Sequence, residues 1–214
     1  MSIDERSLMI AGPFGQIEAI LCEVTCKSSS DKPRVAVLCH PHPLYGGTMD
    51  NKVVSTLARV YHDLGITTLR FNFRGVGGSE GAHADAIGEV DDLCFLSEWL
   101  MSRYPEAQLL LAGFSFGSAI AAAASERLPV MHMVLVAPPV TRYSFATEGS
   151  FTCPVVLVLG GQDELVNGES VRLWMSQLQS PVEEILLSEA SHFFHGQLIA
   201  LRESLAVALK QALN

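Results

Sequence analysis

A serine between two glycines marks the stretch of the sequence most able to do chemistry, GFSFG at residues 113–117. The apolar run LLLA before it is typical of a buried strand, and the run SAIAAAA after it is typical of a helix. A GxSxG sequence between a strand and a helix forces a sharp turn, and the glycines remove side chains that would collide there. The turn exposes the Ser115 hydroxyl beside the first helical amides, which predicts a nucleophile next to an anion-binding site.

A serine nucleophile needs a base, and the base needs a third group that orients it. Asp163 follows the apolar run VVLVLG, and His192 follows EEILLS, so both come shortly after predicted strands. The carboxyl ends of parallel strands meet at one edge of a sheet, where α/β proteins collect their site residues. The sequence therefore predicts a catalytic triad of Ser115, Asp163 and His192.

Two of these assignments have alternatives. Asp163 could instead shape its loop or cap the helix that follows, as many aspartates after strands do. His195 is a rival base, three residues after His192 in the sequence SHFFH. We favour His192 because it follows the strand more closely, whereas His195 falls where the last helix is expected to begin.

The elements that must position these residues are short apolar strands alternating with amphipathic helices. Strands are expected at 8–11, 16–24, 34–39, 67–73, 109–114, 133–137, 155–160 and 183–188, and helices at about 50–64, 88–103, 116–127, 168–178 and 195–212. This alternation predicts an α/β fold with a mainly parallel sheet. The turn GPFG between the first two strands predicts an antiparallel hairpin. We expect a single domain over residues 1–214.

The serine motif, its strand–turn–helix context and the order Ser115, Asp163, His192 resemble the α/β-hydrolase superfamily. The sequences HPHP, YGGTMDNKV and FNFRGVGGSEG resemble a small bacterial branch related to dienelactone hydrolases, which have a cysteine where this chain has Ser115. The resemblance implies an eight-stranded, mostly parallel sheet with an antiparallel N-terminal hairpin and helices on both faces. It also places the base at His192.

The loop CHPHPLYGG after the first parallel strand should supply half of an oxyanion hole. Proline has no amide hydrogen, so Pro41 and Pro43 cannot donate. The first free amide is that of His42, which the resemblance also assigns, and Leu44 is the alternative. Together with the Phe116 amide, that of His42 would give two donors for a tetrahedral oxygen.

Two other interpretations of the glycine- and histidine-rich loops are disfavoured. The histidines of HPHP could ligate zinc, but an extended His-x-His points its rings to opposite sides, and no further ligands have zinc-site spacing. The run FRGVGGSEG lacks the lysine and the spacing of a phosphate-binding loop. We expect it to be structural, with Arg74 holding a nearby carboxylate such as Glu80. No metal or cofactor is expected.

The interval 138–154 is too short for a lid domain, so an open pocket is expected. Its lining is predicted to include Leu44, Tyr45, Tyr143, Phe145 and Phe193. Such a pocket favours a small or exposed carboxylic ester or thioester and disfavours an interfacial lipase. A noncatalytic binding protein, an acyltransferase and an amidase remain alternatives.

The composition limits the kinds of partner and the location that can be expected for the protein. The net charge of −9 and the absence of a Lys/Arg run disfavour nucleic acid. The amino terminus has no apolar core of signal-peptide length, and no later segment offers about 18 uninterrupted apolar residues. A cytoplasmic protein without a membrane partner is therefore expected. The five cysteines are scattered and are expected to be free thiols. The pattern leaves the oligomeric state open.

Overall fold

The computed structural model describes residues 3–24, 32–143, 145 and 151–213, and its strands form one sheet. The strands are β1 (Ile3–Gly12), β2 (Gly15–Val24), β3 (Arg34–Cys39), β4 (Thr67–Phe71), β5 (Gln108–Phe114), β6 (Val130–Val136), β7 (Val155–Gly160) and β8 (Val182–Leu187). The helices are α1 (Lys52–Asp63), α2 (Ile87–Arg103), α3 (Phe116–Ser125), α4 (Gly168–Met175) and α5 (Leu198–Ala212), with a short 3-10 helix η1 (Pro43–Tyr45).

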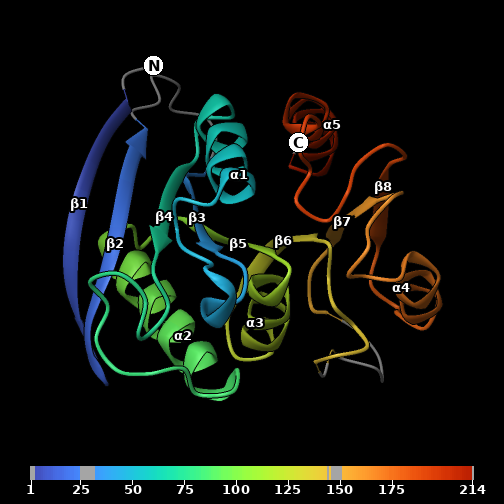
Figure 1. The fold of residues 1–214 in the computed structure, drawn as a ribbon. Helices are drawn as coiled ribbons and strands as arrows, with labels where there is room; N and C mark the ends of the chain where they lie inside the picture. The colour runs from blue at the N-terminus through green and yellow to red at the C-terminus, as the bar shows by residue number, and fades with distance from the viewer. Residues whose placement is uncertain (1–2, 25–31, 144, 146–150, 214) are drawn as a thin grey trace.

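The sheet is mixed, with strand order β1-β2-β4-β3-β5-β6-β7-β8 (Figure 1). The β1–β2 hairpin is antiparallel and β2 pairs antiparallel with β4, while the other neighbours are parallel. The predicted eight-stranded, mostly parallel α/β-hydrolase sheet with an antiparallel N-terminal hairpin is therefore confirmed.

The central strands are buried on both faces, which explains their continuous apolar sequences. All residues of β4 and β7 are buried, and only the first residue of β3 and of β5 is partly exposed. Helices α1 and α5 pack together on one face of the sheet, and α2 packs on α3 on the other (Figure 1). The alanines of α3 have small side chains, so this helix lies close against β5 and β6.

The element bounds differ from the sequence prediction most at the start of the chain, and β6, α4 and α5 each differ by three residues at one end. Strand β1 begins at Ile3 because its whole length pairs with β2, although residues 4–7 are polar and carry no hydrophobic signal. Helix α5 begins at Leu198, three residues later than expected. Phe194 and Gly196 before it have positive φ angles of 54° and 74°, which no helix accommodates.

The site is positioned by a reversal of strand order next to β3. The chain passes from β3 through α1 to β4 on one side, and then through α2 to β5 on the other side. The loops that leave the carboxyl ends of β3 and β5 therefore diverge and leave a crevice between them. These two loops carry the predicted oxyanion residues and Ser115.

Some sequence predictions fall partly outside the described residues. Residues 144 and 146–150 of the interval between β6 and β7 are among these, and so is Cys26. The four described cysteines are free and buried, namely Cys22, Cys39, Cys94 and Cys153. Of the helices in the described ranges, none has both the length and the apolar character needed to cross a bilayer.

Candidate active site

Ser115 occupies a strained turn between β5 and α3. Its φ and ψ angles are 52° and −119°, in a region that non-glycine residues rarely adopt. A Cβ at Gly113 would lie 2.1 Å from the carbonyl oxygen of Gly117, and a Cβ at Gly117 would lie 2.4 Å from that of Cys39. Gly113 is therefore required for the close approach of β5 to the start of α3, and Gly117 for the close approach of the turn to β3. Together these contacts fix the direction of the serine side chain.

The three residues that the sequence singled out lie in one hydrogen-bonded row. His192 Nε2 is 3.0 Å from Ser115 Oγ, and His192 Nδ1 is 2.9 Å from Asp163 Oδ2. A carboxylate only accepts hydrogen bonds, so Nδ1 carries the ring proton and Nε2 is left to accept from the serine hydroxyl. The side chains of Asp163 and His192 are only 3% and 4% exposed, which protects this row from water.

The Asp163 carboxylate makes hydrogen bonds within its own loop and also to the histidine. Its Oδ1 accepts hydrogen bonds from the amides of Leu165 (2.8 Å) and Val166 (2.7 Å), which shapes the loop after β7. Its Oδ2 is left for the histidine. The turn therefore holds the carboxylate in the orientation that the ring requires.

The two histidines of SHFFH have different surroundings. The His192 ring packs between Phe114 and Phe193, with centroid separations of 5.2 and 5.1 Å, and its amide donates to Glu164 Oε2 at 3.2 Å. His195 is exposed and its ring stacks on the outer side of Phe193. The structure thus brings His192, and not His195, to Ser115.

The amides of His42 and Phe116 are both without a hydrogen-bond acceptor among the described residues. Phe116 is the first residue of α3, so its N–H has no partner within the helix. The Leu44 amide, the alternative donor, bonds to His42 Nδ1 at 3.2 Å. Of the candidate donors considered, His42 and Phe116 are the two free ones.

His40 connects the loop after β3 to the loop after β4. The Phe73 amide donates to His40 Nε2 (3.0 Å), so His40 Nδ1 carries the proton and donates to the Pro41 carbonyl (2.6 Å). Burial lowers the pKa of His40 to about 4, so the ring stays neutral at ordinary pH. A protonated ring would lose the bond from Phe73 and loosen the segment that carries His42.

Acid should destabilise the fold through such buried histidines. Burial also lowers the pKa of His132 to about 4, and its Nδ1 has no hydrogen-bond partner within the described structure. The unfolded chain takes up these protons near pH 6.5, before the folded chain does, so stability falls as the pH drops from about 6.5 to about 4. Each histidine contributes up to about 3 kcal/mol to this loss.

The measurement is the free energy of unfolding between pH 7 and pH 4, from denaturant titrations of the wild type and of His132→Leu. We expect the variant to lose less stability on acidification than the wild type, because one buried proton-binding site is gone. His195→Gln removes an exposed histidine and serves as the control. Equal pH dependence of wild type and His132→Leu would contradict this account.

His83 lies against the loop that carries His42, and the sequence analysis did not predict it as a site residue. The His83 ring lies against His42 and Phe116, with centroids 5.0 and 5.7 Å away, and its Nδ1 is 2.8 Å from the fully buried Glu89 carboxylate. Burial lowers the pKa of His42, and the neighbouring His83 lowers it further. These contacts join distant segments, so no local motif announces them.

The predicted partner of Arg74 was wrong. Arg74 makes two hydrogen bonds of 2.7 Å to Asp92 on α2 and a third to the carbonyl of Gly88. Glu80 turns the other way, and its carboxylate accepts from the Gln16 amide of the hairpin (2.8 Å). The loop after β4 is nevertheless structural, because these bonds tie it to α2 on one side and to β2 on the other.

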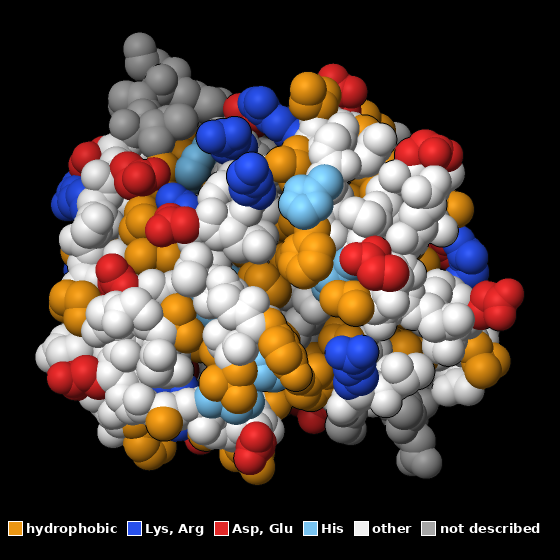
Figure 2. Space-filling view, viewed as in Figure 1, with side chains coloured by type: hydrophobic (Ala, Val, Ile, Leu, Met, Phe, Trp, Pro, Cys, Tyr) orange, Lys and Arg blue, Asp and Glu red, His pale blue; other side chains and the backbone are white. Residues whose placement is uncertain are grey.

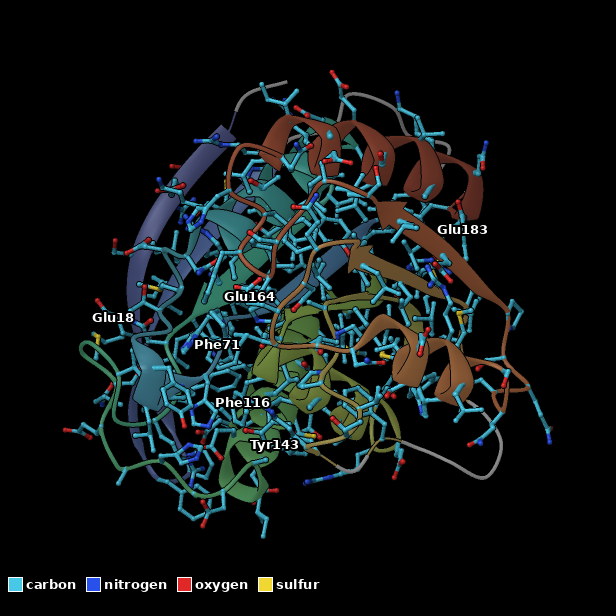
Figure 3. The ribbon with its side chains drawn as sticks, turned by 45° about the vertical axis from the view of Figure 1, so that its right-hand side comes forward. Glu18, Phe71, Phe116, Tyr143, Glu164 and Glu183 are labelled. Atoms are coloured by element: carbon cyan, nitrogen blue, oxygen red, sulfur yellow. The ribbon has the colours of Figure 1, made fainter. Side chains whose placement is uncertain are left out.

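A cavity of about 300 Å³ opens beside Ser115. It is lined by Pro41, His42, Tyr45, Gly46, Gly47, Asn51, Ser115, Phe116, Pro139, Arg142, Tyr143, Leu165, His192 and Phe193. Histidine and hydrophobic side chains gather on the face that carries η1 and α3 (Figure 2). The rings of Phe116 and Tyr143 pack edge to face at 5.3 Å (Figure 3).

The predicted pocket residues divide into two groups. Tyr45, Tyr143 and Phe193 line the cavity. Leu44 is 69% exposed and lies outside the lining, because the 3-10 turn directs it to solvent. Phe145 is buried against Trp174 and belongs to the core. Arg142, Asn51 and Leu165 are among the lining residues that were not predicted.

Comparison with known proteins agrees with this architecture. Residues 32–145 match the family model described as serine aminopeptidase, S33. An α/β serine hydrolase homologue from Coxiella burnetii is 44% identical, with a TM-score of 0.89 over 95% of this chain and 97% of that one. A lidless α/β serine hydrolase from Xanthomonas campestris is 34% identical, with a TM-score of 0.90 over 97% and 94%.

A curated relative of Rickettsia prowazekii, described as an uncharacterized protein, is 36% identical over 193 residues, 86% of this chain and 79% of that one. The sheet and these relationships define the class as α/β-hydrolase. The chain belongs to the hydrolase family described as serine aminopeptidase, S33. The closer relation to dienelactone hydrolases stays a prediction.

Proposed function

We propose that the protein is a serine esterase that cleaves small or exposed carboxylic esters or thioesters through an acyl-enzyme intermediate. The observation that carries this proposal is the row Ser115, His192, Asp163, with successive distances of 3.0 and 2.9 Å, at the edge of an open cavity. Each spacing lies within hydrogen-bond reach, as proton transfer requires.

In the proposed acylation step, Ser115 Oγ forms a bond to the ester carbonyl carbon while its proton moves to His192 Nε2. The carbonyl oxygen becomes an anion that accepts hydrogen bonds from the amides of His42 and Phe116. The bond to the alcohol oxygen then breaks, and His192 returns the proton to the leaving alcohol or thiol. Asp163 stabilises the imidazolium that exists between these two transfers.

Deacylation repeats the same chemistry with water. His192 takes a proton from water, the resulting hydroxide attacks the acyl carbon, and the proton passes to Ser115 Oγ as the acid leaves. The net result is one ester and one water converted to one acid and one alcohol. An alcohol or amine acceptor in place of water would make the same site an acyltransferase.

The cavity favours an ester over an aminopeptidase substrate. An aminopeptidase must bind the free ammonium group of its substrate, for which a carboxylate is the natural partner. Among the described residues that line the cavity, none is Asp or Glu, and Arg142 brings a positive charge that would repel an ammonium group. This charge distribution supports ester cleavage as the proposed reaction.

The direct test of the proposed function is a set of p-nitrophenyl esters of increasing acyl length, read by release of nitrophenolate. A cavity of about 300 Å³ holds about ten water-sized volumes, so we expect kcat/KM to be highest for short acyl chains and to fall for long ones. Amide and thioester analogues of the best substrate establish bond preference. No turnover of any ester would reject the proposal.

Asp163→Asn should lower kcat by about 10⁴-fold while the protein stays folded. The asparagine oxygen can still accept from the Leu165 and Val166 amides, so the turn is kept. Its NH₂ group then faces His192 Nδ1 and forces the ring proton onto Nε2, where it blocks proton transfer from the serine. Ester turnover and thermal unfolding are measured together.

Glu189→Gln, which removes a charge from an exposed residue of the loop after β8, is the matched control. We expect this control to keep wild-type turnover. Near-normal turnover in Asp163→Asn would show that another acid orients the histidine.

A further inference from the structure

The cavity beside Ser115 contains a positive charge, and none of the described residues that line it carries a negative one. Arg142 is exposed, lines the cavity, and has no ion pair or side-chain hydrogen bond within the described ranges. It is the one Lys or Arg among the described lining residues, and none of them is Asp or Glu. Because the whole chain has a net charge of −9, this local excess of positive charge runs against the average of the molecule.

Arg142 is held in place by the turn that follows β6. Its amide donates to the carbonyl of Pro139 (2.9 Å), and the Tyr143 amide donates to the same oxygen (3.3 Å). The Tyr143 ring is fixed against Phe116, the residue after the serine. The guanidinium therefore extends from an anchored backbone, and the neighbouring Tyr143 ring packs on Phe116 beside Ser115 (Figure 3).

The nearest polar groups are also suited to an anion. Burial raises the pKa of the Tyr143 phenol, so its O–H remains a donor at neutral pH, and no described residue accepts from it. The Asn51 side-chain oxygen bonds to the Val53 amide, which leaves its NH₂ group as a further donor at the cavity. Three donors thus line the opening, and the described lining residues include no carboxylate.

We propose that the site selects esters that carry a carboxylate away from the scissile bond, and that Arg142 is the residue that selects them. A guanidinium binds a carboxylate through two parallel hydrogen bonds, which an exposed and unpaired arginine can form without breaking an existing pair. The net charge of −9 repels an anionic substrate on average, whereas the Arg142 guanidinium attracts it at this opening. This inference rests on the proposed esterase function.

The carboxylate could lie on the acyl or on the alcohol part of the ester, and two substrate pairs distinguish these. The acyl pair is the mono-p-nitrophenyl ester of adipic acid and its neutral methyl ester. The alcohol pair is para-butanoyloxybenzoate and its neutral methyl ester. The measured quantity is the ratio of kcat/KM for the anionic member over the neutral member of each pair.

In the wild type we expect a ratio of about ten or more in at least one pair at low ionic strength, and a smaller ratio at high salt because salt screens the charge. Arg142→Met should lower this ratio about tenfold, chiefly through a higher KM for the anionic ester. Arg142→Lys should keep part of it, since the charge remains without the planar fork. Arg59→Met removes the same charge from an exposed position on α1 and should leave the ratio unchanged.

The neutral esters separate this inference from the proposed function. Turnover of the neutral members with ratios near one in both pairs would overturn the assignment of Arg142 and leave the esterase proposal standing. A high ratio that survives in Arg142→Met would overturn it as well. If no member of either pair is hydrolysed, the esterase proposal fails and this inference fails with it.

Discussion

Ser115→Ala should abolish ester hydrolysis, with kcat reduced by about 10⁴-fold or more, while the fold is retained. The alanine keeps the Cβ that already occupies the strained turn, so the backbone of this turn is unaffected by the change. What is lost is the oxygen 3.0 Å from His192 Nε2, and with it the proposed acyl-enzyme. Turnover of a short p-nitrophenyl ester and the unfolding midpoint measure the two expectations.

A fluorophosphonate probe gives an independent measurement of the same assignment. We expect the wild type to be labelled once, on the peptide that contains Ser115, and the alanine variant to remain unlabelled. Ser191→Ala removes the hydroxyl next to His192 in the chain and should be labelled as the wild type is. Labelling that persists in Ser115→Ala would reject the serine, and a wild type that resists the probe would favour a noncatalytic binding protein.

The positions of Ser115, Asp163 and His192 could be predicted because each depends on a local pattern. A buried strand is visible as an apolar run, and the first polar residues after it lie at the carboxyl edge of the sheet. The spatial order of the strands, by contrast, has no local signal. That β3 lies between β4 and β5, and so opens the crevice, depends on packing of the whole sheet.

Side-chain directions in the loops could not be predicted. Arg74 was paired with Glu80, the nearest carboxylate along the chain, but Asp92 on α2 comes closer once the helix packs on the sheet. Phe145 was expected in the pocket, yet its ring is buried more completely against Trp174 in the core. Tertiary contacts decide the directions of such side chains. An aromatic ring packs where it is most fully buried, and a guanidinium binds the carboxylate that it can reach with the best geometry.

Arg142 illustrates the same limit from the functional side. In the sequence it is an unremarkable charge in PPVTRYS, and nothing near it predicts a partner. Only the fold shows that the turn after β6 carries it to the cavity next to Phe116 and Tyr143. The proposed role of Arg142 depends on the charges that surround it in space, and these charges are known only once the fold is known.

The choice between the two histidines of SHFFH gives the second large effect. His192→Gln should lower kcat by about 10⁴-fold or more, because a glutamine amide can neither take the serine proton nor return one to the leaving group. His195→Gln should keep substantial activity, since that ring stacks on the outer side of Phe193 and is exposed to solvent.

Both variants carry the same substitution three residues apart, so each is the control for the other. The measurement is kcat and KM on the best p-nitrophenyl ester, with fluorophosphonate labelling rates as a second readout. Labelling of Ser115 should slow strongly in His192→Gln, because the hydroxyl is no longer activated, and should be retained in His195→Gln. An inactive His195→Gln with an active His192→Gln would reverse the assignment. Full activity in both would exclude a serine–histidine mechanism, because no other described imidazole lies within hydrogen-bond distance of Ser115.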